Sequence, residues 1–231
     1  METARSDRRP GIMGKYQWGD RAQPDWPCTL PNPPCFTTIA NWTAYGSVER
    51  YGERYGQKDE SFAMLLDLPG RVDVILKIAA SGIPVEDKRL FEAKGWHLCS
   101  GSEVSLDWSR YWGFVTGSSG ELSAAKHGYV ASRCGWISDR TVCYLAAGRP
   151  AIVQDTRIPP HVMPRADGFL VFTTVEKAAD NIRNVTAEYE KHRRAAIELA
   201  ETVFSYKVTL PDLIEKALGK PSVLCSSHKR V

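Results

Sequence analysis

The fold is decided by one stretch of the chain, Gly135 to Thr156, which reads GWISDRTVCYLAAGRPAIVQDT. Ser138 is a typical N-cap residue, and Gly148 is typical of the position just beyond a helix end. The stretch therefore predicts a helix over Ser138–Ala147. Pro150–Gln154 follows at once and is apolar enough for a buried strand. A helix that leads directly into a buried strand is typical of α/β proteins.

The alternation of strands and helices continues on both sides of this stretch. Further strands are predicted at Phe36–Ala40, Val72–Ala79, Trp96–Cys99 and Gly168–Phe172. Helical patterns are predicted between them at Glu60–Leu66, Pro84–Lys94 and Ser105–Thr116. Because strands alternate with helices, the sequence predicts a parallel sheet with right-handed crossover connections.

The C-terminal part of the predicted domain is helical. One apolar stripe recurs at three- and four-residue steps and predicts a long helix with one buried face: Ile182, Val185, Tyr189, His192, Ala196, Leu199 and Val203. His192 is interpreted as a packed, hydrogen-bonded histidine and not as a ligand. Leu210–Leu218 is predicted to form a last helix.

The two ends of the chain differ from its middle. Residues 1–34 are rich in proline and arginine and are almost without aliphatic residues, so they cannot bury enough apolar surface to offset their ordering entropy. We expect an irregular segment there, one folded domain over residues 35–219, and a loose tail over residues 220–231.

Composition excludes several classes of protein. The 231 residues carry 30 Lys and Arg against 27 Asp and Glu, a formal charge of +3, which argues against a dedicated nucleic-acid binder. No apolar run reaches the length of a membrane-spanning helix, and no secretory signal is recognisable. The six cysteines are scattered without zinc-site spacing, which favours a reducing, cytoplasmic location and gives no case for a bound metal.

An anion site is the chemistry that the deciding stretch favours. The first amides of the predicted helix at Ser138 are unpaired, and the helix dipole favours a negative charge there. Lys126 and Arg140 are candidate cationic donors to a diphosphate. Gly120 and Glu121 are interpreted as part of a turn near the carboxyl edge of the sheet, where open α/β folds bind ligands. The alternative is purely structural: Ser138 caps the helix, and Asp139 and Arg140 form an exposed first turn.

The sequence also resembles a known family. The order Gly-Trp-x-Ser-Asp-Arg-x-x-x-Tyr-Leu-Ala-x-Gly-Arg-Pro-x-Ile-x-Gln-Asp-Thr over residues 135–156 is similar to the donor-binding half of bacterial GT-B glycosyltransferases, described as family 1 or glycosyltransferase-like. The resemblance extends through Phe36–Trp42, Gly52–Gly56 and Gly120–Tyr129 to Gly168–Phe172, and covers about residues 35–218. It implies a single Rossmann-like half-domain with a long C-terminal helix.

The resemblance implies specific roles for this chain's residues. The nucleotide diphosphate of a sugar donor would meet the start of the helix, at Trp136, Ile137, Ser138 and Asp139. Gln154, Asp155 and Thr156 would face the sugar. The pattern departs from the family in that Arg157 stands where glycine is usual. Gly135 and Cys143 also stand where many retaining members carry two glutamates.

The resemblance also implies the partners and leaves three hypotheses. The donor would be a nucleotide diphosphate sugar, which is a substrate and not a cofactor, and the acceptor is unknown. The first 34 residues are too few for the acceptor half, so a missing N-terminal domain or a second chain would supply it. A glycosyltransferase donor domain is the first hypothesis. The others are a non-catalytic module that binds a nucleotide sugar or a protein, and a different α/β enzyme that shares only the sheet.

Overall fold

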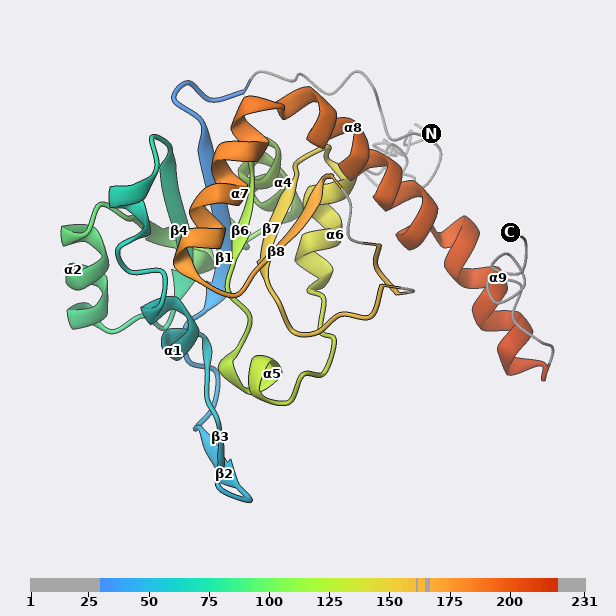
Figure 1. The fold of residues 1–231 in the computed structure, drawn as a ribbon, viewed down its shortest axis with the longest axis horizontal. Helices are drawn as coiled ribbons and strands as arrows, with labels where there is room; N and C mark the ends of the chain where they lie inside the picture. Colours follow the sequence, from blue (N-terminus) through green and yellow to red (C-terminus); the bar gives the residue numbers. More distant parts are fainter. Residues whose placement is uncertain (1–29, 161, 165–166, 220–231) are drawn as a thin grey trace, which may run out of the picture.

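The computed structural model describes residues 30–160, 162–164 and 167–219. The expected irregular segment falls almost wholly outside these residues, as does the expected tail. The central feature is a six-stranded sheet in the order β5-β4-β1-β6-β7-β8 (Figure 1). Every neighbouring pair in it is parallel. Its strands are β1 (Cys35–Asn41), β4 (Ile75–Ser81), β5 (His97–Ser100), β6 (Gly120–Ser123), β7 (Ala151–Gln154) and β8 (Phe169–Phe172).

Helices cover both faces of the sheet. The helices are α1 (Lys58–Ala63), α2 (Val85–Ala93), α3 (Gly101–Val104), α4 (Trp108–Thr116), α5 (His127–Ala131), α6 (Asp139–Ala146), α7 (Val175–Ala187), α8 (Tyr189–Leu199) and α9 (Tyr206–Ala217). A 3-10 turn, η2 (Leu68–Arg71), and a π-helical turn, η3 (Ala200–Phe204), complete them. The sequence-based prediction of a Rossmann-like parallel sheet flanked by helices is thereby confirmed.

The core is divided into two clusters, one on each side of the sheet. The larger packs α1, α2 and α7 around the sheet and includes the stacked pair Trp42 and Phe62, whose ring centroids lie 5.3 Å apart. The smaller joins α6 and α8 through Leu145, Ala196 and Leu199. Helices α7 and α8 therefore serve different clusters although they are adjacent in sequence.

The predicted long helix bends between these clusters. Its apolar stripe is buried at Ile182, Val185, Ala196 and Leu199, but Glu188 leaves the helical conformation and separates α7 from α8. From Tyr189 onward a long C-terminal helical run follows through η3 and α9, as predicted (Figure 1).

His192 confirms its predicted structural role. Its side chain is fully buried, and Nδ1 accepts a hydrogen bond of 3.1 Å from the backbone N–H of Gly168. Gly168 has φ of +89°, and a Cβ there would meet the backbone of Ala195 and Ala196. A glycine is therefore required where β8 begins beneath α8.

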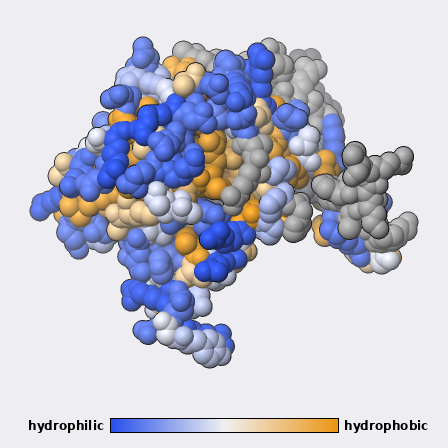
Figure 2. All heavy atoms as spheres, viewed as in Figure 1, coloured by the Kyte–Doolittle hydropathy of each residue, from blue (hydrophilic) through white to orange (hydrophobic). Residues whose placement is uncertain are grey.

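One element projects away from the sheet. Strands β2 (Val48–Arg50) and β3 (Glu53–Tyr55) form an antiparallel hairpin that extends below α1 and α5 (Figure 1). Figure 2 shows its surface as mainly hydrophilic. Glu49 lies opposite Arg54 and Arg50 opposite Glu53, so charges of opposite sign face each other across the hairpin.

Candidate functional site

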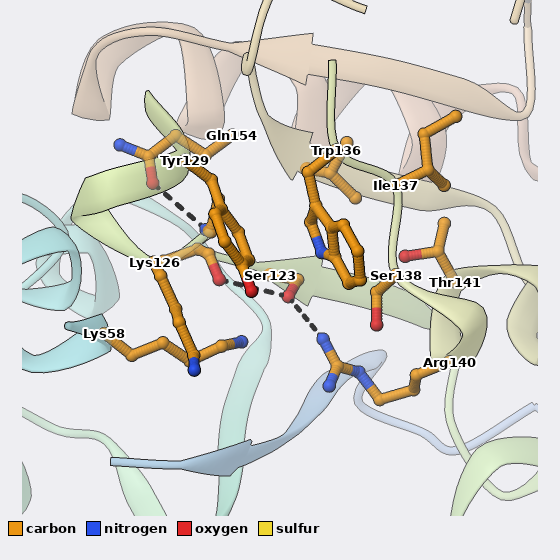
Figure 3. A pocket seen from close by; sticks show the side chains of 13 residues that line it. Lys58, Ser123, Lys126, Tyr129, Trp136, Ile137, Ser138, Arg140, Thr141 and Gln154 are labelled. Atoms are coloured by element: carbon orange, nitrogen blue, oxygen red, sulfur yellow. Dashed lines mark hydrogen bonds between the residues drawn. The ribbon is translucent and has the colours of Figure 1, made fainter. Parts of the chain in front are cut away.

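A cavity of about 230 Å³ lies where β6 and β7 end. In a parallel sheet the carboxyl ends of the strands share one edge, which is the usual ligand site of such folds. The cavity is lined from five parts of the chain: Lys58 of α1, the end of β6 with the residues after it (123–126), Tyr129 of α5, the start of α6 with its preceding loop (residues 136–138, 140 and 141), and Val153 and Gln154 of β7. Figure 3 shows these side chains around one space.

Lys58 is placed by a clamp between two loops. It is the first residue of α1, directly after the hairpin. The carbonyl groups of Gly56 and Gln57 accept hydrogen bonds from the N–H groups of Gly128 and His127, at 3.0 and 3.2 Å. The N–H of Gly56 in turn donates to His127 Nδ1 at 3.3 Å. The start of α1 is therefore fixed against the start of α5, and the lysine points into the cavity.

Lys126 approaches the same cavity from the start of α5. Its Nζ donates a 3.0 Å hydrogen bond to the hydroxyl of Tyr45 and lies 4.1 Å from the centre of that ring. The hydrogen bond from Lys126 lowers the pKa of Tyr45. The hydroxyl and the ring of Tyr45 therefore fix the position of the Lys126 side chain without an opposite charge beside it.

Arg140 forms the floor of the cavity. Its Nε donates to Glu121 Oε1 at 2.9 Å, one terminal nitrogen donates to Ser123 Oγ at 2.8 Å, and the other donates to the carbonyl of Ile39. Glu121 is fully buried and the Arg140 side chain is 14% exposed. This guanidinium is consequently a charge held in a fixed position by the sheet.

An aromatic wall closes another side of the cavity. The rings of Tyr129 and Trp136 lie 4.9 Å apart with their planes inclined by 37°. Trp136 is 47% exposed. The Thr156 hydroxyl donates to the carbonyl of Trp136 at 2.8 Å and fixes the loop. The cavity therefore has positively charged side chains beside the flat aromatic surface of Tyr129 and Trp136, an arrangement that fits an anionic group attached to a ring.

The structure brings together six of the eleven site residues predicted from the sequence. The cavity is lined by Lys126, Trp136, Ile137, Ser138, Arg140 and Gln154. Gln154 also supports the edge of the sheet, because its side-chain oxygen accepts a hydrogen bond from the N–H of Ala125 at 3.1 Å.

Gly120 and Glu121 do not form the turn that we predicted at the carboxyl edge. They begin strand β6, at the opposite end of the strand from the cavity. A Cβ at Gly120 would come within 2.6 Å of the Pro150 carbonyl and 2.8 Å of the Phe36 ring, so close strand packing explains the glycine. Glu121 acts from below as the partner of Arg140.

Asp139, Asp155 and Thr156 also lie outside the lining. Asp139 Oδ1 accepts hydrogen bonds from its neighbours, the Ser138 hydroxyl at 3.2 Å and the Arg140 N–H at 2.8 Å. Asp155 accepts a bond from the N–H of Arg157, whose φ is +64°, and thereby stabilises the turn at which the family usually has glycine. Ser138 occupies the N-cap position, but its side chain makes no capping hydrogen bond.

Among the described residues that line the cavity, Lys58 is the charged one that sequence reasoning missed. The signal available was its position two residues after Gly56, at the end of one of the segments that carry the family resemblance. A charged residue in the first turn of a short helix has no pattern of its own, and only the clamp to α5 shows where it points.

Two negative findings apply to the described part of the chain. No group of three or more His, Cys, Asp or Glu residues is arranged there to hold a metal ion. None of the helices described has both the length and the apolar character needed to cross a bilayer.

The fold has counterparts among solved structures. TarM, a GT-B glycosyltransferase, matches 82% of this chain with a TM-score of 0.56 and 10% sequence identity. The GtfA/B complex matches 75% of this chain with a TM-score of 0.48 and 13% identity. Sequence comparison finds no matching family model and no matching curated protein.

The match to TarM defines a class of fold. The match to TarM shows that the chain has a glycosyltransferase-like fold of the GT-B kind. The chain spans 35% of the length of TarM and 33% of the matched chain of the GtfA/B complex.

Proposed function

We propose that this chain is the donor-binding part of a glycosyltransferase and that its cavity holds a nucleotide diphosphate sugar. The observation that carries the proposal is the convergence of Lys58, Lys126 and Arg140 on one cavity at the carboxyl edge of a GT-B-like sheet (Figure 3). The glycosyltransferase-like fold alone supports only the general reaction class.

The charges of the site support a diphosphate as ligand. None of the described residues that line the cavity is acidic, and the nearby carboxylate of Glu121 is already paired with Arg140. The two lysines therefore face the cavity without a carboxylate that neutralises them there. Cations held in place beforehand stabilise a departing diphosphate more strongly than mobile water does, because they need no reorganisation.

The aromatic wall supports a ring next to the phosphates. Trp136 presents nearly half of its surface, and Tyr129 backs it. The donor is a substrate in this proposal, so no resident cofactor is required. The acceptor and the group that activates it would come from protein outside the described residues, as the partial overlap with TarM suggests.

Isothermal titration calorimetry with a panel of nucleotide diphosphates and nucleotide sugars tests the donor site. We expect weak binding by the unmodified chain, with at least a tenfold loss in Lys58→Met and Lys126→Met. Lys88→Met is the matched control, since Lys88 lies on α2 and is engaged at the surface with Glu92 at 3.9 Å. If no panel member gives heat, the donor-site proposal is wrong.

A non-catalytic binding module is the second candidate, and one observation favours it. A general base must reach the proton that it removes, and the described lining contains no carboxylate. Such a module would bind the same donors without consuming them. Incubation with the donor that binds, followed by chromatography for released nucleoside diphosphate, separates the two: release that Lys58→Met abolishes supports the enzyme, and stable donor supports the module.

A further inference from the structure

Lys58 is enclosed in an unusual way for a lysine. Its side chain lines the cavity and is only partly exposed, and among the described residues its Nζ has no hydrogen-bond or ion-pair partner. Lys126 differs, because its Nζ is satisfied by Tyr45. An enclosed amine without a partner loses the hydration that favours its charged form.

The groups that face Lys58 are mostly cationic. Arg140 of α6 and Lys126, which precedes α5, both disfavour a further positive charge, whereas Glu121 of β6 favours it. Glu121 is already engaged with Arg140. The acidic and aromatic groups of the adjoining elements are occupied elsewhere or are uncharged: Glu60 of α1 with Arg54 and Ser47, Tyr45 with Lys126, and Tyr129 with the ring of Trp136. Asp59 of α1 has one buried carboxylate oxygen without a partner, and His127 of α5 accepts the Gly56 N–H.

We propose that anion binding in this cavity is linked to the uptake of one proton by Lys58, whose Nζ then becomes the ammonium partner of a phosphoryl oxygen. The inference rests on the proposed donor site. The proton comes from solvent, and no covalent bond between protein and ligand forms or breaks.

The direction of the linkage follows from the charges. In the empty cavity, burial and then the positive charge of Arg140 hold the pKa of Lys58 well below its usual value. A bound dianion raises that pKa again, because an opposite charge nearby favours the ammonium form. Between the two pKa values binding takes up a proton. Affinity is therefore highest below the pKa of the empty state and falls as the pH rises above it, by about tenfold per pH unit for one proton.

Sulfate is a suitable probe, because its two charges are constant across the neutral and mildly alkaline range. Its dissociation constant is measured at a series of pH values by NMR titration, from the Trp136 indole and Ala125 amide signals. We expect the constant to rise about tenfold per pH unit above the pKa of the empty state. In Lys58→Arg, which stays protonated, we expect a flat profile, and in Lys126→Arg, the matched control, we expect the wild-type slope.

The outcomes separate this inference from the donor site itself. A flat profile in the unmodified chain overturns the proton linkage, and so does an equal slope in Lys58→Arg. Absence of sulfate binding overturns it as well. The nucleotide-sugar titration decides the donor site independently: donors that bind without pH dependence leave that function in place and remove only the role of Lys58 as a proton acceptor.

Discussion

Replacing Glu121 by glutamine isolates the buried ion pair beneath the cavity. The substitution keeps the shape of the side chain and removes its charge, so Arg140 remains in place without a counter-ion. Glu121 is fully buried, its Oε1 lies 2.9 Å from Arg140 Nε, and the Arg140 side chain is 14% exposed. The remaining hydrogen bonds that Arg140 donates, to Ser123 and Ile39, are accepted by neutral groups that cannot compensate a full charge.

The magnitude follows from what is lost. Breaking a buried pair by removing one partner costs about 3–5 kcal/mol, because a charge stays buried without compensation. The residual exposure of Arg140 places Glu121→Gln near the lower end, at about 3 kcal/mol of the free energy of unfolding. For a domain of this size that is a decrease of about 6–12 °C in the melting temperature.

Chemical denaturation followed by circular dichroism measures the effect. Glu176→Gln is the control: Glu176 pairs with Arg71 at 3.1 Å, but both side chains are exposed, and we expect no resolvable change. The double variant Glu121→Gln, Arg140→Met should be more stable than the sum of the single effects predicts. A Glu121→Gln variant as stable as the control, or strictly additive effects, would refute the reasoning.

Three further predictions concern stability. Lys58→Met should stabilise the empty protein near neutral pH. Because the pKa of Lys58 is lowered in the folded state, unfolding of the wild type takes up a proton, and the free energy of unfolding rises with pH up to the pKa of the unfolded chain, about 10.5. Urea titrations at a series of pH values should show this slope in the wild type and not in the variant. Burial lowers the pKa of His192, so the free energy of unfolding should fall as the pH drops through about 6.5, and His192→Gln should flatten that dependence in the same titrations. Gly168→Ala should destabilise the fold by about 1–3 kcal/mol or more, because the added Cβ meets the backbone of α8. Gly70→Ala is the control, since a Cβ there meets nothing within 4 Å and should be nearly neutral. Thermal unfolding compares the two variants, and equal melting temperatures would contradict the prediction.

The general fold could be predicted because its signals are local and repeat along the chain. Val72–Ala79 and Pro150–Gln154 are apolar runs of strand length; β4 (Ile75–Ser81) overlaps the first and extends two residues beyond it, and β7 (Ala151–Gln154) lies within the second. Strand β6 was missed because Gly120 and Glu121 are poor strand formers. Their places are fixed by a close contact with Phe36 and by the ion pair with Arg140, both of which join residues far apart in sequence.

The candidate site was harder to predict for the same reason. Arg140 could be recognised as a cation near a helix start, but its hydrogen bonds to Glu121, Ser123 and Ile39 depend on three separate strand residues. Lys58 reaches the cavity only because Gly56 and Gln57 are bound to the start of α5. A sequence motif shows which residues stand at these positions, but it does not show the tertiary contacts that orient their side chains.

The pairing of Arg140 with Glu121 determines how much charge the cavity offers. The two form a nearly neutral unit, so Arg140 contributes a fixed dipole and little net attraction. Lys58 and Lys126 then supply two positive charges when both are protonated, which equals the charge of a diphosphate linked at both ends, as in a nucleotide sugar. Uptake of a proton from solvent by Lys58 when an anion binds therefore balances the two charges of the ligand, and the empty cavity avoids holding three positive charges close together. The formal charge of +3 for the whole sequence does not show the charge of the groups at the cavity.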